Sequence, residues 1–148
     1  MINIAAEAAT ILLVEDNDVD RESVRRAFQR HRIENQVVEV VDGVEALDVM
    51  RGVAGIEALQ RPYLVLLDLA LPRIDGHTVL REMRADPLLR DSIVFVLTTS
   101  KDAGDVKACY EQQVAGYLVK GEVGSGLKGL AELIQSYANV VRFPNGHH

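Results

Sequence analysis

The sequence predicts an α/β fold, in which a parallel sheet of five strands is covered by helices on both faces. Five short apolar runs alternate with five segments of helical length, and apart from Glu39 in the second run they are apolar throughout rather than at every second residue. Each helix that connects two parallel strands must bury its apolar stripe on the sheet, so this alternation favours helices on both faces. Continuous apolar strands agree with that arrangement.

The five strands are predicted where β-branched and aliphatic residues cluster between polar segments. They cover residues 11–14, 37–41, 63–67, 93–97 and 117–119.

Helices are predicted from apolar residues at helical spacing after each run. The first, fourth and fifth stripes are Val24, Ala27 and Phe28; Val106, Cys109, Tyr110 and Val114; and Leu127, Leu130, Ala131, Ile134, Tyr137 and Val141. The weaker second and third stripes are Val44, Leu47 and Ala54, and Val79, Leu80 and Met83. Segment 51–62 is long for a connection, and it either extends the second helix or forms a surface loop.

The size of the chain allows one such domain. Its 148 residues, 48% of them hydrophobic, suffice for one core and are too few for two domains of ordinary size. We place the domain at 10–141, between an N-terminal tail at 1–9 and a C-terminal tail at 142–148. His147 and His148 resemble the remnant of a purification tag and receive no functional weight.

Composition argues against several classes of protein. Acidic residues outnumber basic ones by 22 to 16, and no block of Lys or Arg marks a nucleic-acid surface. Cys109 is the single cysteine, which excludes an intramolecular disulfide and fits a reducing cytosol. Residues 1–9 lack the features of a signal peptide, and no apolar run reaches the length of a membrane span. We therefore expect a cytoplasmic protein that binds neither nucleic acid nor membrane.

Polar side chains stand where the predicted strands end. Glu15 and Asp16 follow the first strand, Asp68 the third, Thr98 the fourth and Lys120 the fifth. Ligands of open parallel sheets bind beyond the carboxyl ends of the strands, near a switch in strand order. These side chains therefore mark the expected site.

The acidic residues predict a metal site. Clustered carboxylates repel one another unless a cation lies between them, and oxygen ligands without Cys or His select a hard cation such as Mg²⁺. Asp16 and Asp68 would bind it directly, and Glu15 through a water. Asp18 and Asp20 are interpreted as complementing the positive end of the first helix, whose cap is Asn17 or Asp18.

Asp68 closes an apolar run, where an ionised side chain requires partners. A carboxylate can attack a phosphoryl group and form an aspartyl phosphate, provided that a metal and a fixed cation neutralise the developing charge. Lys120 is the candidate cation, and Thr98 offers a hydroxyl. Each residue alone also fits an ordinary strand end, and Tyr117 also fits a core or interface position.

Together these motifs resemble the receiver domain of two-component response regulators. The resemblance is carried by LLVEDN at 12–17, LLDLALPRIDG at 66–76, VLTTS at 96–100 and GYLVK at 116–120. It implies a flavodoxin-like, doubly wound sheet with strand order 2-1-3-4-5 and five helices. It also implies Mg²⁺-dependent transfer of a phosphoryl group to the aspartate from a sensor histidine kinase or a phosphotransfer protein.

The resemblance also implies roles for individual residues. Asp68 corresponds to the phosphoacceptor, Glu15 and Asp16 to the acidic metal-binding pair, and Lys120 to the lysine that contacts the phosphoryl group. The backbone carbonyl of Ala70 would complete the metal site.

Two further residues correspond to the family's conformational switch. Thr98 matches the switch hydroxyl and Tyr117 the rotating aromatic. We hypothesise that Thr98 moves toward the phosphoryl oxygens and that Tyr117 turns inward to fill the vacated space.

Within the family, the chain is most similar to small stand-alone receivers that serve bacterial phytochrome-type kinases. We expect no output domain after Val141, so the signal would pass to another protein, and a homodimer through the fourth helix, fifth strand and fifth helix is one expected form. Two alternatives stay open. One is a receiver-like scaffold that is not phosphorylated. The other is a phosphatase with Asp68 as nucleophile, although Ala70 stands where its second aspartate is expected.

The residue after Lys120 departs from the family pattern. Receivers usually have a proline there, often after a cis peptide bond, whereas this chain has Gly121. A cis bond without proline costs roughly 2.5 to 4 kcal/mol. The sequence therefore predicts a trans Lys120–Gly121 bond, a rearranged loop and less firm aiming of Lys120.

Overall fold

The computed structural model describes residues 9–53 and 55–144, which form a five-stranded parallel sheet between two layers of helices. The strands are β1 (Thr10–Val14), β2 (Val37–Val40), β3 (Tyr63–Leu67), β4 (Ile93–Thr98) and β5 (Gly116–Val119). Their order is β2-β1-β3-β4-β5, so the predicted fold and topology are confirmed. The order reverses between β1 and β3, which makes the carboxyl ends of these two strands the expected ligand site.

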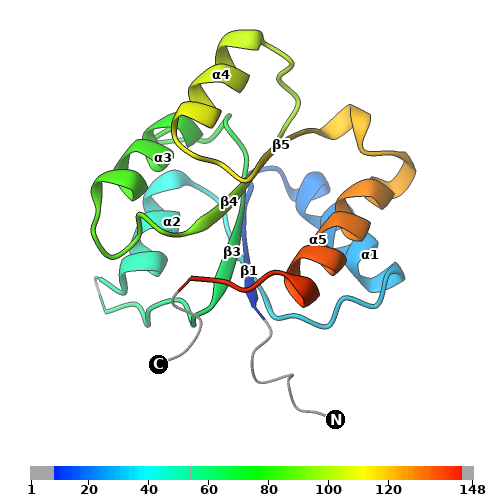
Figure 1. The fold of residues 1–148 in the computed structure, drawn as a ribbon, viewed down its shortest axis with the longest axis horizontal. Helices are drawn as coiled ribbons and strands as arrows, with labels where there is room; N and C mark the ends of the chain where they lie inside the picture. Colours follow the sequence, from blue (N-terminus) through cyan, green and yellow to red (C-terminus); the bar gives the residue numbers. More distant parts are fainter. Residues whose placement is uncertain (1–8, 54, 145–148) are drawn as a thin grey trace.

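Five α-helices cover the sheet (Figure 1). They are α1 (Asp18–Arg30), α2 (Gly43–Arg51), α3 (Gly76–Ala85), α4 (Ala103–Glu111) and α5 (Lys128–Val140). Helices α1 and α5 lie on one face, and α2, α3 and α4 lie on the other. Two short 3₁₀ helices, η2 (Lys120–Glu122) and η3 (Ser125–Leu127), connect β5 to α5.

Local sequence fixes where most helices begin. The side chains that cap α1 to α4 each accept a hydrogen bond from the backbone N–H three residues later, and they are Asn17, Asp42, Asp75 and Asp102. Such bonds satisfy N–H groups that have no partner within the helix. The cap predicted at Asn17 or Asp18 is thus Asn17.

Successive strand residues enter different cores, because side chains alternate across a sheet. On β1, Leu12 and Val14 join the core under α2 and α3, whereas Ile11 and Leu13 join the core under α1 and α5. All five residues of β1 and of β3 are buried, as the continuous apolar pattern predicts.

Several predicted boundaries and stripes are wrong at their ends. Val41 lies outside β2 and is 41% exposed, whereas Thr98 belongs to β4. On α4 only Cys109 is buried, because Tyr110 is half exposed and Val114 follows the end of the helix. Val141 caps α5 and is also exposed.

Of the predicted segment 51–62, the described residues after Arg51 form a loop rather than an extension of α2. Helix α2 ends at Arg51, and Gly52 follows with a φ of 70°, a left-handed conformation that ends helices. Ala54, His147 and His148 lie outside the described residues. In the part of the chain that the structure describes, no helix has the length and apolarity needed to cross a membrane.

Candidate functional site

The site lies at the carboxyl edge of the sheet, where β1 and β3 are neighbours. Val14 pairs with Leu67, so the next residues, Glu15 and Asp68, leave the sheet side by side. The Asp68 N–H donates to the carbonyl of Val14 (3.1 Å), and the Glu15 N–H donates to the carbonyl of Val40 (3.1 Å). Backbone pairing therefore brings together two carboxylates that are 53 positions apart in the sequence.

Glu15, Asp16 and Asp68 form an acidic cluster. One carboxylate oxygen from each lies within 4.8 Å of the others. Glu15 is 2% exposed and Asp68 is 6% exposed, whereas Asp16 is exposed. Buried carboxylates require a counter-charge, and an all-oxygen set that retains one open side matches a hard divalent cation. The residues present thus fit such a metal.

The pKa of Glu15 reflects its burial within this cluster. Burial, assisted by the nearby charge of Asp68, raises the pKa of Glu15 from 4.5 to about 7, although contacts with Lys120 and the Asn17 N–H oppose the shift. A cation within the cluster would favour the ionised form of Glu15.

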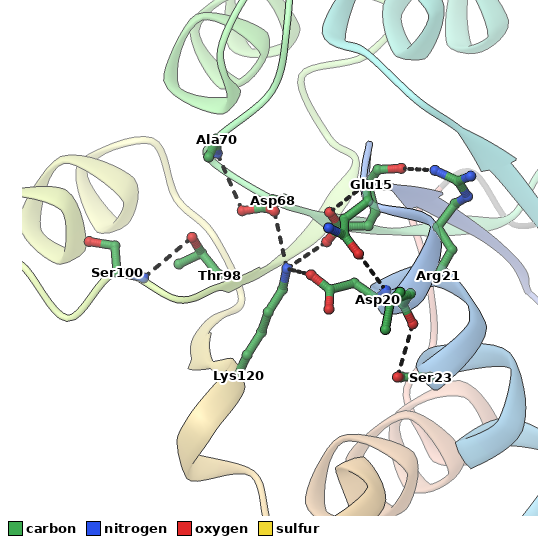
Figure 2. A network of polar contacts seen from close by, with 11 residues as sticks. Glu15, Asp20, Arg21, Ser23, Asp68, Ala70, Thr98, Ser100 and Lys120 are labelled. Atoms are coloured by element: carbon green, nitrogen blue, oxygen red, sulfur yellow. Dashed lines mark hydrogen bonds and ion pairs between the residues drawn. The ribbon is translucent and has the colours of Figure 1, made fainter.

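Lys120 reaches this cluster from the end of β5 (Figure 2). Its Nζ donates to Glu15 Oε1 (2.7 Å), Asp20 Oδ2 (2.8 Å) and Asp68 Oδ2 (3.2 Å). Burial opposes the charged form, yet the hydrogen bonds to Asp20 and Glu15 raise the pKa of Lys120 above its usual value. Lys120 is therefore a fixed cation.

The trans geometry predicted after Lys120 is confirmed. Among the described residues the one cis peptide bond is Arg61–Pro62, so Lys120–Gly121 is trans and continues into η2. The effect of Gly121 on the aim of Lys120 stays a prediction; here three carboxylates hold the ammonium, and the side chain is 14% exposed.

Asp20 is the member of this network that the sequence interpretation missed. Its side chain was expected only to complement the end of α1, yet it contacts Lys120, 100 residues later. Asp20 lies in the first turn of α1, four residues after Asp16, but no local pattern shows that its side chain reaches Lys120.

Thr98 and Tyr117 are each hydrogen-bonded to the backbone of Ser100, in the turn that follows β4. Thr98 is buried, and its Oγ1 accepts a long hydrogen bond from the Ser100 N–H (3.5 Å). The Tyr117 hydroxyl donates to the Ser100 carbonyl (3.0 Å). The same turn is tied to two helices, because Asp105 of α4 accepts from the Ser100 hydroxyl (2.6 Å) and bonds His77 of α3 (2.9 Å).

Ala70 lies in the loop after β3. Its N–H donates to Asp68 Oδ1 (3.3 Å), and the residue is exposed. Gly76 shapes this loop, since its N–H donates to the Leu69 carbonyl (2.9 Å), and a Cβ at Gly76 would lie 2.5 Å from the Asp68 carbonyl oxygen. Only a residue without a side chain permits that approach.

A family model described as the response regulator receiver domain matches residues 11–133 of this chain. The chain belongs to the response regulator receiver family. This receiver is 38% identical over 133 residues to the probable methanogenesis regulatory protein FilR2 of Methanothrix harundinacea, a match that covers 90% of this chain and 85% of FilR2. It is also 38% identical over 125 residues to the response regulator Rcp1 of Synechocystis, covering 84% of this chain and 83% of Rcp1.

Solved structures agree with this assignment. The Mn²⁺-bound form of Rcp1 superposes on the receiver with a TM-score of 0.82 and 36% identity, covering 92% of this chain and 99% of Rcp1. The phosphorylated cyanobacterial phytochrome response regulator RcpA gives a TM-score of 0.83 and 34% identity, covering 93% and 99%. The receiver is therefore homologous to phytochrome response regulators in fold and in sequence.

Proposed function

We propose that this receiver accepts a phosphoryl group on Asp68 from the phosphohistidine of a sensor histidine kinase and relays the signal by a conformational switch. The observation that carries the proposal is the setting of Asp68, which lies at the carboxyl end of β3 within an acidic cluster and 3.2 Å from Lys120. The phosphorylated state of the homologue RcpA supports it.

The transfer requires little covalent chemistry from the protein. A lone pair of an Asp68 carboxylate oxygen forms the new O–P bond while the N–P bond of the donor breaks, and its electron pair returns to the imidazole nitrogen. Later attack of water on phosphorus releases inorganic phosphate and restores the carboxylate. Lys120 contributes positioning and charge neutralisation to both steps. We assign no enzymatic activity beyond this self-catalysed phosphorylation and dephosphorylation.

The metal in this proposal is Mg²⁺. Glu15, Asp16, Asp68 and the backbone carbonyl of Ala70 would hold it, and Mg²⁺ supplies neutralisation of charge on phosphoryl oxygens. The Mn²⁺-bound structure of Rcp1 supports a divalent metal at this site.

The proposed switch consists of Thr98 and Tyr117. A Thr98 hydroxyl that turns toward the phosphoryl group must give up its bond from the Ser100 N–H. Because Ser100 also accepts from the Tyr117 hydroxyl, rearrangement of this turn reaches Tyr117 on β5. A free-energy difference of a few kcal/mol between the two states suffices to shift their populations.

The proposed partner is a sensor histidine kinase of the phytochrome type or a phosphotransfer protein, and the cytoplasm is the proposed compartment. The homology to RcpA, a phytochrome response regulator, supports the choice of kinase. A homodimer through α4, β5 and α5 stays a prediction.

The test is incubation with Mg²⁺ and acetyl phosphate, followed by intact-mass measurement. We expect the wild type and the control Asp91→Asn to gain one phosphoryl group and Asp68→Asn to gain none. Absence of modification in the wild type would contradict the proposal and favour the unphosphorylated scaffold. Steady turnover of unrelated phosphate esters that requires Asp68 would favour the phosphatase instead.

A further inference from the structure

Three carboxylates share the ammonium group of Lys120, and one of them stands apart from the others. A lysine ammonium has three donors, and here each donor is directed at a different carboxylate. The Nζ lies 2.7 Å from Glu15 and 2.8 Å from Asp20, but 3.2 Å from Asp68. The ammonium is therefore drawn toward the α1 side of the site.

Asp20 differs from the other two carboxylates in position. Glu15 and Asp68 belong to the acidic cluster, and Asp20 does not. The first turn of α1 holds Asp20 in place, because its N–H donates to Asn17 Oδ1 (2.9 Å). Its side chain is 40% exposed, so the carboxylate is accessible to water while it holds Lys120.

We propose that Asp20 is a positioning residue that acts through Lys120: it competes with the phosphoryl group for the ammonium and so restrains phosphorylation of Asp68. The proposal rests on the function proposed above, because it concerns the response of Lys120 to a phosphoryl group on Asp68.

The physical basis is competition between anions for one cation. A phosphoryl group adds about 1.5 to 2 negative charges, and Lys120 is the cation that contacts Asp68 directly. Uptake of the phosphoryl group therefore weakens the contact between Lys120 and Asp20. The free energy lost with that contact reduces the net free energy of phosphoryl binding.

The variant Asp20→Asn isolates this effect. Asparagine keeps the shape of the side chain and one oxygen acceptor, but it removes the negative charge. We expect Asp20→Asn to bind trifluoroberyllate, an anionic mimic of the phosphoryl group, about fivefold more tightly than the wild type at saturating Mg²⁺. The affinity is measured by ¹⁹F NMR on the full chain.

Asp18→Asn is the matched control. Asp18 lies in the same first turn of α1, pairs with Arg21 and is 88% exposed, so its substitution makes the same change in charge and in the helix terminus without touching Lys120. We expect its trifluoroberyllate affinity to change by less than about twofold. Isothermal titration calorimetry with Mg²⁺ alone separates effects on the metal, and both variants should shift that affinity equally.

A double-mutant cycle with Lys120→Met tests whether Asp20 acts through Lys120. With Lys120 absent, Asp20→Asn should change the trifluoroberyllate affinity no more than Asp18→Asn does. A full effect of Asp20→Asn in this background would overturn the proposal, and thermal unfolding of each variant shows that it is folded.

Two outcomes on the wild-type background would also overturn it. Equal trifluoroberyllate affinities of Asp20→Asn and Asp18→Asn would show that Asp20 does not restrain phosphorylation. Weaker trifluoroberyllate binding by Asp20→Asn would show that Asp20 aims Lys120 at the phosphoryl group. Both refute the role of Asp20 while the phosphoacceptor function stands. Wild-type protein that binds no trifluoroberyllate, or binds it equally after Asp68→Asn, would refute the proposed function and this role with it.

Discussion

Gly76→Ala is expected to destabilise the protein and to weaken metal binding. The added Cβ would lie 2.5 Å from the carbonyl oxygen of Asp68 and 2.7 Å from the Cα of Leu69. Both obstacles are backbone atoms, so the start of α3 or the end of β3 must move by nearly 1 Å to restore ordinary contact distances.

The expected change in the free energy of unfolding for Gly76→Ala combines two opposing effects. Overpacking of this kind costs typically 1 to 3 kcal/mol, and here rigid backbone on both sides places the cost near the upper end. Alanine regains at most about 1 kcal/mol of helix propensity over glycine, and less at the first position of α3. The net loss is about 2 kcal/mol, which lowers the melting temperature by roughly 4 to 8 °C for a domain of this size.

The assay is urea unfolding, with Gly121→Ala as the control. A Cβ at Gly121 meets no atom within 4 Å, so this variant should stay within about 0.5 kcal/mol of the wild type. Displacement of the Asp68 carbonyl also disturbs the loop that carries Ala70, so Mg²⁺ affinity should fall in Gly76→Ala alone. Equal unfolding midpoints for the two variants would refute the reasoning.

Three further predictions concern charges around the sheet. Asp68→Asn should raise the free energy of unfolding by about 1 kcal/mol without divalent ions, since it removes one of three clustered carboxylates. In thermal unfolding, Mg²⁺ should stabilise this variant less than the wild type. The control Asp91→Asn, away from the cluster, should show neither effect. The hydrogen bond from the Ser100 hydroxyl holds the pKa of Asp105 below 3.8, so Asp105 stabilises the fold above that value and less as the pH falls through its folded-state pKa. The difference in unfolding free energy between wild type and Asp105→Asn should therefore shrink as the pH falls below 3.8, and a constant difference would contradict this account. Arg84 is half-buried and donates hydrogen bonds to four backbone carbonyls. Arg84→Met should therefore lower the free energy of unfolding, measured in urea, by about 2 to 4 kcal/mol. A decrease below about 1 kcal/mol would show that water replaces these bonds.

The strands were predictable where the sequence pattern reflects burial on both faces of the sheet. Strands β1 and β3 are flanked by other strands and covered by helices, so their sequences are apolar throughout and their limits could be placed within one residue. Strand β5 lies at the edge of the sheet, and each of its residues is only partly buried. Helix α4 packs near that edge, which explains why apolar spacing there overestimated burial and Tyr110 remains exposed.

The candidate site was predictable in its members but not in its connections. Strand ends placed Glu15, Asp68 and Lys120 at one edge, because parallel strands share that edge whatever their separation in sequence. The carboxylates that Lys120 contacts depend on how α1 packs against the sheet. No local sequence pattern encodes that packing. Asp20 was therefore interpreted as a helix-end residue, although it makes one of the two shortest contacts of the ammonium.

The charges of the site fit the proposed binding of a divalent cation and a phosphoryl group. Three carboxylates, Glu15, Asp20 and Asp68, contact one ammonium, and Asp16 lies beside Glu15 and Asp68, so the formal charge of the site is negative. Burial is the main cause of the raised pKa of Glu15, and the nearby charge of Asp68 adds to it. A divalent cation in the acidic cluster would take over the neutralisation of Glu15 and Asp68, and Lys120 would then be opposed mainly by Asp20. This arrangement predicts that binding of a divalent cation favours phosphoryl uptake on Asp68, because the ammonium is then opposed mainly by Asp20.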